Sequence, residues 1–234
     1  MSINESSSQD DREFTEKRED RDLGFGAVVA TESQKRLLNR DGSFNVERHG
    51  LGWRSTLSLY HSLLEMSSPR FSRPVASIVF SRNAIIAPYR GITAFEFRIA
   101  NRRKSQIIDL EAKPLLSRWE HDSKGAKRRR FYQLELERRR VTFFPLAWTI
   151  VHPIDDDSPL RKMHADDLAG GDAEFLVLLT GIDETFSQMV HARSSYKWDE
   201  VTWSHGFESI FERPTADAPL AIDVSRIHET KPAA

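Results

Sequence analysis

One segment in the middle of the chain, residues 143–160, constrains the fold more than any other. Residues 144–151 are almost all apolar, aromatic or β-branched, which is typical of a strand covered on both faces. A proline and three aspartates end this pattern. The pair Ser158-Pro159 then predicts a helix start, with Ser158 as N-cap and Pro159 as first helical residue. Residues 161–169 follow as a predicted short helix, which two glycines close.

The rest of the chain after residue 75 carries repeated strand signals. Apolar and charged residues alternate in residues 95–99 and 134–137, so each of these runs is expected to have one buried and one exposed face. The predicted strands are 76–87, 92–101, 106–117, 129–138, 143–152, 173–181, 186–196, 200–211 and 220–227. Many short strands with one brief helix indicate an all-β, antiparallel sandwich.

Composition excludes several classes of protein. The net charge is −1 although 29% of residues are charged, so no overall basic balance points to nucleic acid. The chain has no cysteine, which excludes disulfide scaffolds and thiolate metal sites and fits a cytosolic protein. No secretory signal peptide is expected, because the N-terminus is rich in serine and acidic residues and lacks an apolar core.

No transmembrane segment is expected. A membrane-spanning helix needs about 20 mostly apolar residues. The longest stretch without Asp, Glu, Lys or Arg is residues 141–154, which is shorter than that and contains two prolines and a histidine.

The N-terminal third is predicted to contain three parts. Residues 1–22 are strongly acidic with almost nothing apolar, which predicts a disordered tail. Residues 23–52 form an N-terminal segment, extended over residues 36–48 with a turn at Asp41-Gly42. Residues 53–71 contain an amphipathic helix. The pattern leaves open whether that helix lies in a membrane interface or packs on a protein core.

Several motifs occur in an order that resembles one family. They are His152-Pro153-Ile154-Asp155-x-x-Ser158-Pro159-Leu160, Asp41-Gly42-x-x-Asn45-Val46, Phe80-Ser81-Arg82-x-x-Ile85-Ile86-Ala87-Pro88, Phe97-Arg98-x-x-Asn101-x-Arg103-Lys104-Ser105, and Asp172-Ala173-Glu174-Phe175 with Tyr196. Together they resemble the cytoplasmic domain of inward-rectifier potassium channels, most closely the bacterial members, over roughly residues 37–211. The resemblance implies an immunoglobulin-like β-sandwich that assembles as a homotetramer. The likeness is one of architecture only, because the antibody-type cysteine pair is missing.

The resemblance also indicates which parts of the family's usual sequence are missing from this chain. Residues 66–70 resemble the end of the family's interfacial "slide" helix, and residues 71–74 resemble the segment after its second membrane helix. The resemblance therefore implies that both membrane helices and the carbonyl-lined selectivity filter are deleted between these two segments. The chain by itself is expected not to conduct. The origin of the deletion stays open.

The resemblance implies three groups of site residues, listed here by expected role. The residues expected to line a cytoplasmic ion pathway are Asp109, Gly181, Ile182, Asp183 and Glu184. The residues expected to bind lipid phosphate are Arg54, Arg70 and Arg73, and the interfacial anchors are Trp53 and Tyr60. The alternative for each group is that its residues occupy ordinary surface or strand positions and have no such role. Arg138-Arg139-Arg140 stands where strong rectifiers carry acidic residues, which argues against strong polyamine block.

No catalytic, metal-binding or nucleic-acid-binding site is expected. His152 with Asp155–Asp157 lacks the accompanying spacing of a metal or acid–base site, and predicts a strand end with an Asp-rich turn. The basic run 127–130 favours a solvated hairpin over a nucleic-acid site. We therefore expect no enzyme activity, no metal site and no cofactor. Potassium ions would pass through the pathway of a complete channel.

The hypothesis from sequence is the cytoplasmic assembly and gating domain of an inward-rectifier channel. It spans residues 72–228, with a tail at 229–234, and anionic membrane lipid is a possible partner. The domain would lie at the cytoplasmic face of the cell membrane in a complete channel. The alternative is a stand-alone β-sandwich binding module without channel activity.

Overall fold

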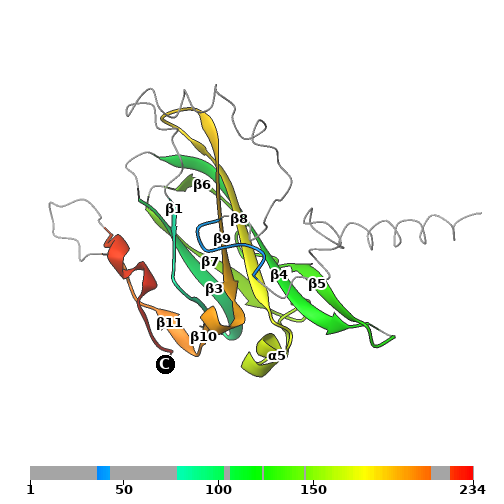
Figure 1. Cartoon of the computed structure of the whole chain (residues 1–234). Coiled ribbons are helices and arrows are strands. Elements are labelled where there is room, and N and C mark those ends of the chain that lie inside the picture. The colour runs from blue at the N-terminus through cyan, green and yellow to red at the C-terminus, as the bar shows by residue number, and fades with distance from the viewer. Residues whose placement is uncertain are drawn as a thin grey trace, which may run out of the picture.

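The computed structural model of this chain describes residues 36–42, 78–102, 106–122, 124–144, 146–211 and 222–233. Strands dominate this part of the chain and form two five-stranded sheets and one two-stranded sheet (Figure 1). The predicted all-β sandwich is confirmed.

The first sheet is built around β3. Its strands are β1 (Ile78–Phe80), β2 (Ala84–Tyr89), β3 (Ile92–Asn101), β7 (Ala147–Ile154) and β10 (Val201–Trp203). Strands β1, β2 and β7 all pair with β3 in antiparallel fashion. Strand β10 pairs with β2 in parallel, which is the one departure from an antiparallel arrangement among the described pairs.

The second sheet is built around the long strand β4. Its strands are β4 (Ile107–His121), β5 (Lys127–Gln133), β6 (Arg140–Phe144), β8 (Glu174–Asp183) and β9 (Gln188–Lys197). Strands β5 and β6 pair with different parts of β4, and the order continues from β4 to β8 and then β9. The β4–β5 hairpin extends at one end of the molecule, at the lower right of Figure 1.

Side chains from both sheets meet in one apolar core. The alternation in β3 places Phe95, Phe97 and Ile99 inward, where each is almost completely buried. The Phe95 ring stacks on Phe175 of β8, with 4.2 Å between the ring centroids. Phe97 contacts Tyr196 of β9 at 5.7 Å between centroids. These aromatic pairs join the two sheets.

Short elements cover the edges. Strands β11 (His205–Phe207) and β12 (Thr230–Pro232) form the small sheet. The helical elements are α5 (Ala165–Gly170), η1 (Trp198–Glu200) and η2 (Val224–His228), of which the last two are 3₁₀ turns. Residues 229–234 are thus not only a tail as expected, because they contain β12, which pairs with β11.

The prediction of one strand over 143–152 is wrong. Strand β6 ends at Phe144 in the second sheet, and β7 begins at Ala147 in the first. A run that is apolar at every position does not distinguish one strand buried on both faces from two strands that change sheets. Phe143, the first residue of the predicted strand, is 71% exposed.

The predicted helix start at Ser158-Pro159 is also wrong. The helix begins at Ala165 with His164 as N-cap, and the Asp167 carboxylate accepts the His164 amide at 2.8 Å. The Ser158 hydroxyl instead accepts the Leu160 amide at 3.1 Å, which makes a local turn. A serine can cap a turn as well as a helix, and a proline is compatible with both.

Other predicted strands have different limits. The run 76–87 divides into β1 and β2 at the buried Ser81, and the run 200–211 divides into β10 and β11. Strand β5 ends at Gln133 rather than at residue 138. The run 220–227 contains η2, because the Asp223 carboxylate accepts the Ser225 amide at 2.9 Å and starts a 3₁₀ turn.

Candidate functional site

The residues expected to line a pathway come together at one end of the second sheet. Asp109 lies on β4 with a positive φ of 53°, where the β4–β8 register shifts between Ile108 and Glu111. A bulge of this kind re-aims a side chain. The Asp109 carboxylate forms an ion pair with Arg140 at 2.7 Å, and both side chains are substantially exposed. Arg140 thus offsets the charge of this carboxylate.

Gly181 lies opposite this bulge and faces the core. A Cβ at this position would lie 2.9 Å from Ile107 Cγ2 and 3.1 Å from Leu110 Cδ1. The glycine therefore allows β8 to approach the inward side chains of β4. This close approach is between two strands of the same domain.

Ile182 belongs to a row of apolar residues across the outer face of this sheet end. The register pairs Phe143 with Ile108, Ile108 with Ile182, and Ile182 with Met189. The two outer members, Phe143 and Met189, are 71% and 66% exposed. We call these four residues the apolar row. Phe186, in the adjoining turn, is also exposed.

The two acidic residues after Ile182 have different environments. Asp183 is 1% exposed, and its Oδ1 accepts the amide of Thr185 at 3.0 Å, so its carboxylate shapes the β8–β9 turn. Glu184 is exposed and its amide donates to the Gln106 carbonyl at 3.0 Å. Of this acidic pair, Glu184 is the residue whose carboxylate is accessible.

His152 lies inside β7 and is almost completely buried. Its Nδ1 contacts the Glu135 carbonyl, which can only accept, so Nδ1 carries the proton. Its Nε2 therefore accepts from the Ser158 hydroxyl at 2.8 Å. Burial lowers the pKa of His152, and the Glu135 carbonyl and Asp155 only partly oppose this effect. The ring connects the β7 strand to the turn that follows it.

The basic run on β5 pairs with acidic and aromatic neighbours. Arg128 lies 3.0 Å from the Asp122 carboxylate, and Lys127 lies over the Trp119 ring. These two contacts fit the expected solvated hairpin. Arg129 does not fit it, because its side chain is fully buried.

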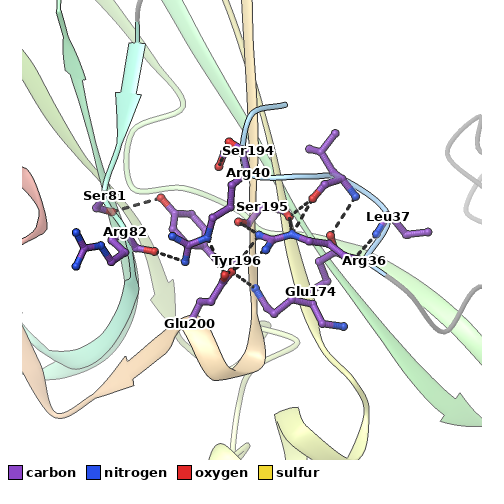
Figure 2. Close-up of polar contacts among 12 residues, drawn as sticks. Arg36, Leu37, Arg40, Ser81, Arg82, Glu174, Ser194, Ser195, Tyr196 and Glu200 are labelled. Carbon is purple, nitrogen blue, oxygen red and sulfur yellow. Dashed lines mark hydrogen bonds and ion pairs between the residues drawn. The ribbon is translucent and has the colours of Figure 1, made fainter. Parts of the chain in front are cut away.

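A second site, which the sequence analysis did not single out, lies on the outer face of the second sheet. Residues 36–42 cross this face next to β8 and β9 (Figure 2). We call them the N-terminal clamp. The Glu174 carboxylate accepts the amides of Leu37 at 3.0 Å and Leu38 at 3.3 Å. The Ser195 hydroxyl donates to the Leu38 carbonyl.

The two leucines of the clamp are buried. Leu37 is 1% and Leu38 is 4% exposed, and both pack with Phe131, Leu176 and the partly buried Leu115. Burying one leucine side chain contributes about 1.5–3 kcal/mol. This small cluster is separate from the main core.

Two arginines anchor the clamp to η1. The Arg36 guanidinium donates to both Glu200 carboxylate oxygens, at 3.1 and 3.0 Å, and Arg40 donates to Glu200 at 2.7 Å. Burial raises the pKa of Glu200, but the Lys197 amide and the two guanidiniums outweigh it, so the pKa lies below its ordinary value. Arg40 also donates to the Arg82 carbonyl.

A buried charge lies beneath the clamp. The Arg129 side chain is 0% exposed and lies 4.0 Å from the Glu174 carboxylate. Its guanidinium donates to the Ser117 hydroxyl at 3.0 Å and to the Asp172 carboxylate at 3.2 Å. Burial lowers the pKa of Arg129, and Asp172 and Glu174 oppose this shift. Glu174 therefore meets Arg129 on one side and two clamp amides on the other.

The clamp ends at the turn that the sequence predicted. Gly42 has φ +83° and its amide donates to the Asn39 carbonyl at 2.9 Å. A Cβ there would lie 2.8 Å from the Arg193 carbonyl. The sequence signal for the clamp was a pair of leucines between arginines in a polar segment. Its hydrogen-bond partner Glu174 lies more than 130 residues away, so no local pattern revealed the contact.

The sequence of the sandwich decides its family. Residues 78–234 match the inward rectifier potassium channel C-terminal domain family. The chain belongs to the inward rectifier potassium channel family. The resemblance noted from the ordered motifs is confirmed.

Individual relatives agree with this membership. The chain is 39% identical over 160 residues to inward rectifier potassium channel Kirbac3.1 of Paramagnetospirillum magnetotacticum. The aligned region covers 68% of this chain and 54% of that protein. It is 32% identical over 173 residues to inward rectifier potassium channel 4 of Rattus norvegicus, which covers 69% of this chain and 37% of that protein. The chain thus spans about half or less of the length of these channels.

The residues expected to contact lipid in this inward-rectifier family member lie outside the described part of the chain. They are Arg54, Arg70, Arg73, Trp53 and Tyr60, and the segments predicted as a disordered tail and an amphipathic helix lie outside it as well. Asn45, Val46 and residues 103–105 of the motifs lie outside them too. Within the described ranges, no helix is long and apolar enough to cross a membrane.

Proposed function

We propose that this chain is the cytoplasmic assembly and gating domain of an inward-rectifier potassium channel, and that it does not conduct alone. Four copies would surround an ion pathway at the cytoplasmic face of a cell membrane. Family membership and the relatives named as potassium channels support the channel assignment.

The observation that carries the assembly proposal is the apolar row. A soluble monomer rarely exposes contiguous apolar side chains without a partner for them. Phe143 and Met189 expose most of their side chains at the same sheet end as Asp109 and Glu184. Symmetric association of several copies would bury the row and bring the carboxylates of each copy together.

The pathway proposal rests on the acidic residues at this end. In a ring of four copies, Asp109 and Glu184 would attract cations to the pathway, while Ile182 and the backbone at Gly181 would shape it. Asp183 would support the turn from within. The Arg140 ion pair reduces the charge of Asp109, which fits weak rather than strong binding of polycations.

Light scattering on the purified chain tests the assembly. We expect a mass of four times the 26.9 kDa chain at high concentration, which falls on dilution. Phe143→Ser with Met189→Ser should shift this equilibrium toward monomer. Ile92 is an apolar residue on the other sheet that is 44% exposed. Ile92→Ser is therefore the control and should leave the equilibrium unchanged.

A monomer at every concentration would overturn the assembly proposal and favour the stand-alone binding module. The absence of conduction has its own test. Potassium-selective current from the purified chain in planar bilayers would contradict the proposed loss of the pore.

A further inference from the structure

The N-terminal clamp is attached to the sandwich as a bound peptide would be. Its hydrogen bonds to Glu174 and Glu200 join residues 136 to 164 positions apart in sequence. Residues 43–77 separate it from β1. The clamp is therefore not tied to the sandwich by a short covalent connection, and its non-covalent contacts hold it in place.

The groove beneath the clamp recognises specific features of its occupant. Glu174 accepts two successive main-chain amides, which requires an extended backbone. Glu200 receives a forked guanidinium, a geometry that arginine provides and lysine does not. Phe131 and Leu176 receive two successive apolar side chains. The occupant that fits is an extended peptide of the form Arg-apolar-apolar.

An empty groove would leave its charged groups with fewer partners. Glu200 would lose both Arg36 and Arg40 and keep the Lys197 amide at 2.9 Å, while Glu174 would lose two amides and keep the Arg129 guanidinium at 4.0 Å. Because Glu174 is 0% exposed beneath the clamp, its carboxylate accepts these amides in place of water. The groove therefore favours an occupant whose donors match the two carboxylates over one that covers them without donors.

We propose that this groove is a sequence-selective docking site for an Arg-apolar-apolar peptide, and that residues 36–42 are its built-in, releasable ligand. The site is independent of the apolar row and of the proposed ion pathway. It would hold the N-terminal segment against β8 and β9 while occupied, and would set that segment free when a competing peptide enters.

Peptide binding to the full chain tests the proposal. The probe is a fluorescent peptide with the sequence of residues 34–43, and the chain carries Arg36→Ala with Leu37→Ser to weaken its own clamp. We expect saturable binding at least about tenfold tighter than to the unaltered chain, because the intact clamp competes at an effective concentration on the order of millimolar.

Changes in the peptide provide controls that leave the protein fold untouched. A scrambled peptide of the same composition has the same charge and should not bind. A peptide with serine at both leucine positions should bind at least about tenfold more weakly. Equal binding of native and scrambled peptides would overturn the proposal, as would no binding of the native peptide to the folded, clamp-weakened chain.

A second measurement needs no variant. Amide hydrogen exchange at Leu37 and Leu38 reports release of the clamp, because both amides donate to the Glu174 carboxylate in the unaltered chain. Excess native peptide should speed exchange of these two amides at least about threefold, and the scrambled peptide should leave the rate unchanged. If the native peptide does not change the rate, the clamp is a fixed part of the fold and the proposal is wrong.

Discussion

At the scale of single residues, Gly181 is required by the packing of strand β8 against β4. Gly181 leaves room for Ile107 and Leu110, so an added methyl group would overlap both. We expect Gly181→Ala to lower the free energy of unfolding by about 1–3 kcal/mol, as overpacking does. Urea unfolding measures this change. Gly170→Ala is the control, since no atom lies within 4 Å of a Cβ there. Equal effects of the two changes would contradict the packing argument.

His152 gives the domain a pH response. Its folded-state pKa lies below its unfolded value, chiefly because the ring is buried, so the unfolded chain binds the proton more readily. Its contribution to stability is complete above the unfolded pKa of about 6.5. That contribution is lost as the pH falls from there toward the folded pKa.

We therefore expect the midpoint temperature to fall between pH 7.5 and 5.5, and to fall less steeply in His152→Gln. Differential scanning calorimetry at several pH values measures both slopes. The exposed His191 provides the control variant His191→Gln. Parallel slopes in the wild type and His152→Gln would show that another group governs this range.

At the scale of elements, Tyr196 joins strand β9 to the other sheet. Its hydroxyl lies 3.3 Å from the Ser81 hydroxyl in the β1–β2 connection, and Ser81 also accepts the Arg98 amide at 3.1 Å. Burial raises the pKa of Tyr196. The ring itself contacts Phe97.

We expect Tyr196→Phe to cost about 0.5–1.5 kcal/mol, the usual net value of a hydrogen bond, and Tyr196→Ala about 3–5 kcal/mol. A double-mutant cycle with Ser81→Ala, measured in urea, isolates the pair. Additive single changes would mean that the two hydroxyls do not stabilise the sheet contact.

At the scale of the whole molecule, the channel-derived and stand-alone interpretations differ in membrane binding. The family resemblance predicts that Trp53 lies at a membrane interface and that Arg73 binds lipid phosphate. We expect the chain to float with vesicles that contain anionic lipid at low salt, and Arg73→Ala or Trp53→Ala to reduce the bound fraction several-fold. Neutral vesicles are the control. No flotation at low salt would favour the stand-alone module.

The sequence by itself determined the class of fold and the family. Alternation in residues 95–99 follows from the two faces of a strand, and β3 has the predicted limits of 92–101. Ordered motifs led to the inward-rectifier family because several matches in order are far more specific than one. The Asp41-Gly42 turn was also predictable, since glycine tolerates the positive φ that it requires.

Only the tertiary structure decided where segments far apart in sequence meet. The apolar run 143–152 changes sheets between β6 and β7, a choice that depends on partners in β4 and β3. Glu174 belongs to one of the family motifs, but only the fold shows that its carboxylate lies against Arg129 and the clamp amides. Local patterns report which face of a strand is apolar. Which distant residues satisfy a buried charge depends on the packed chain as a whole.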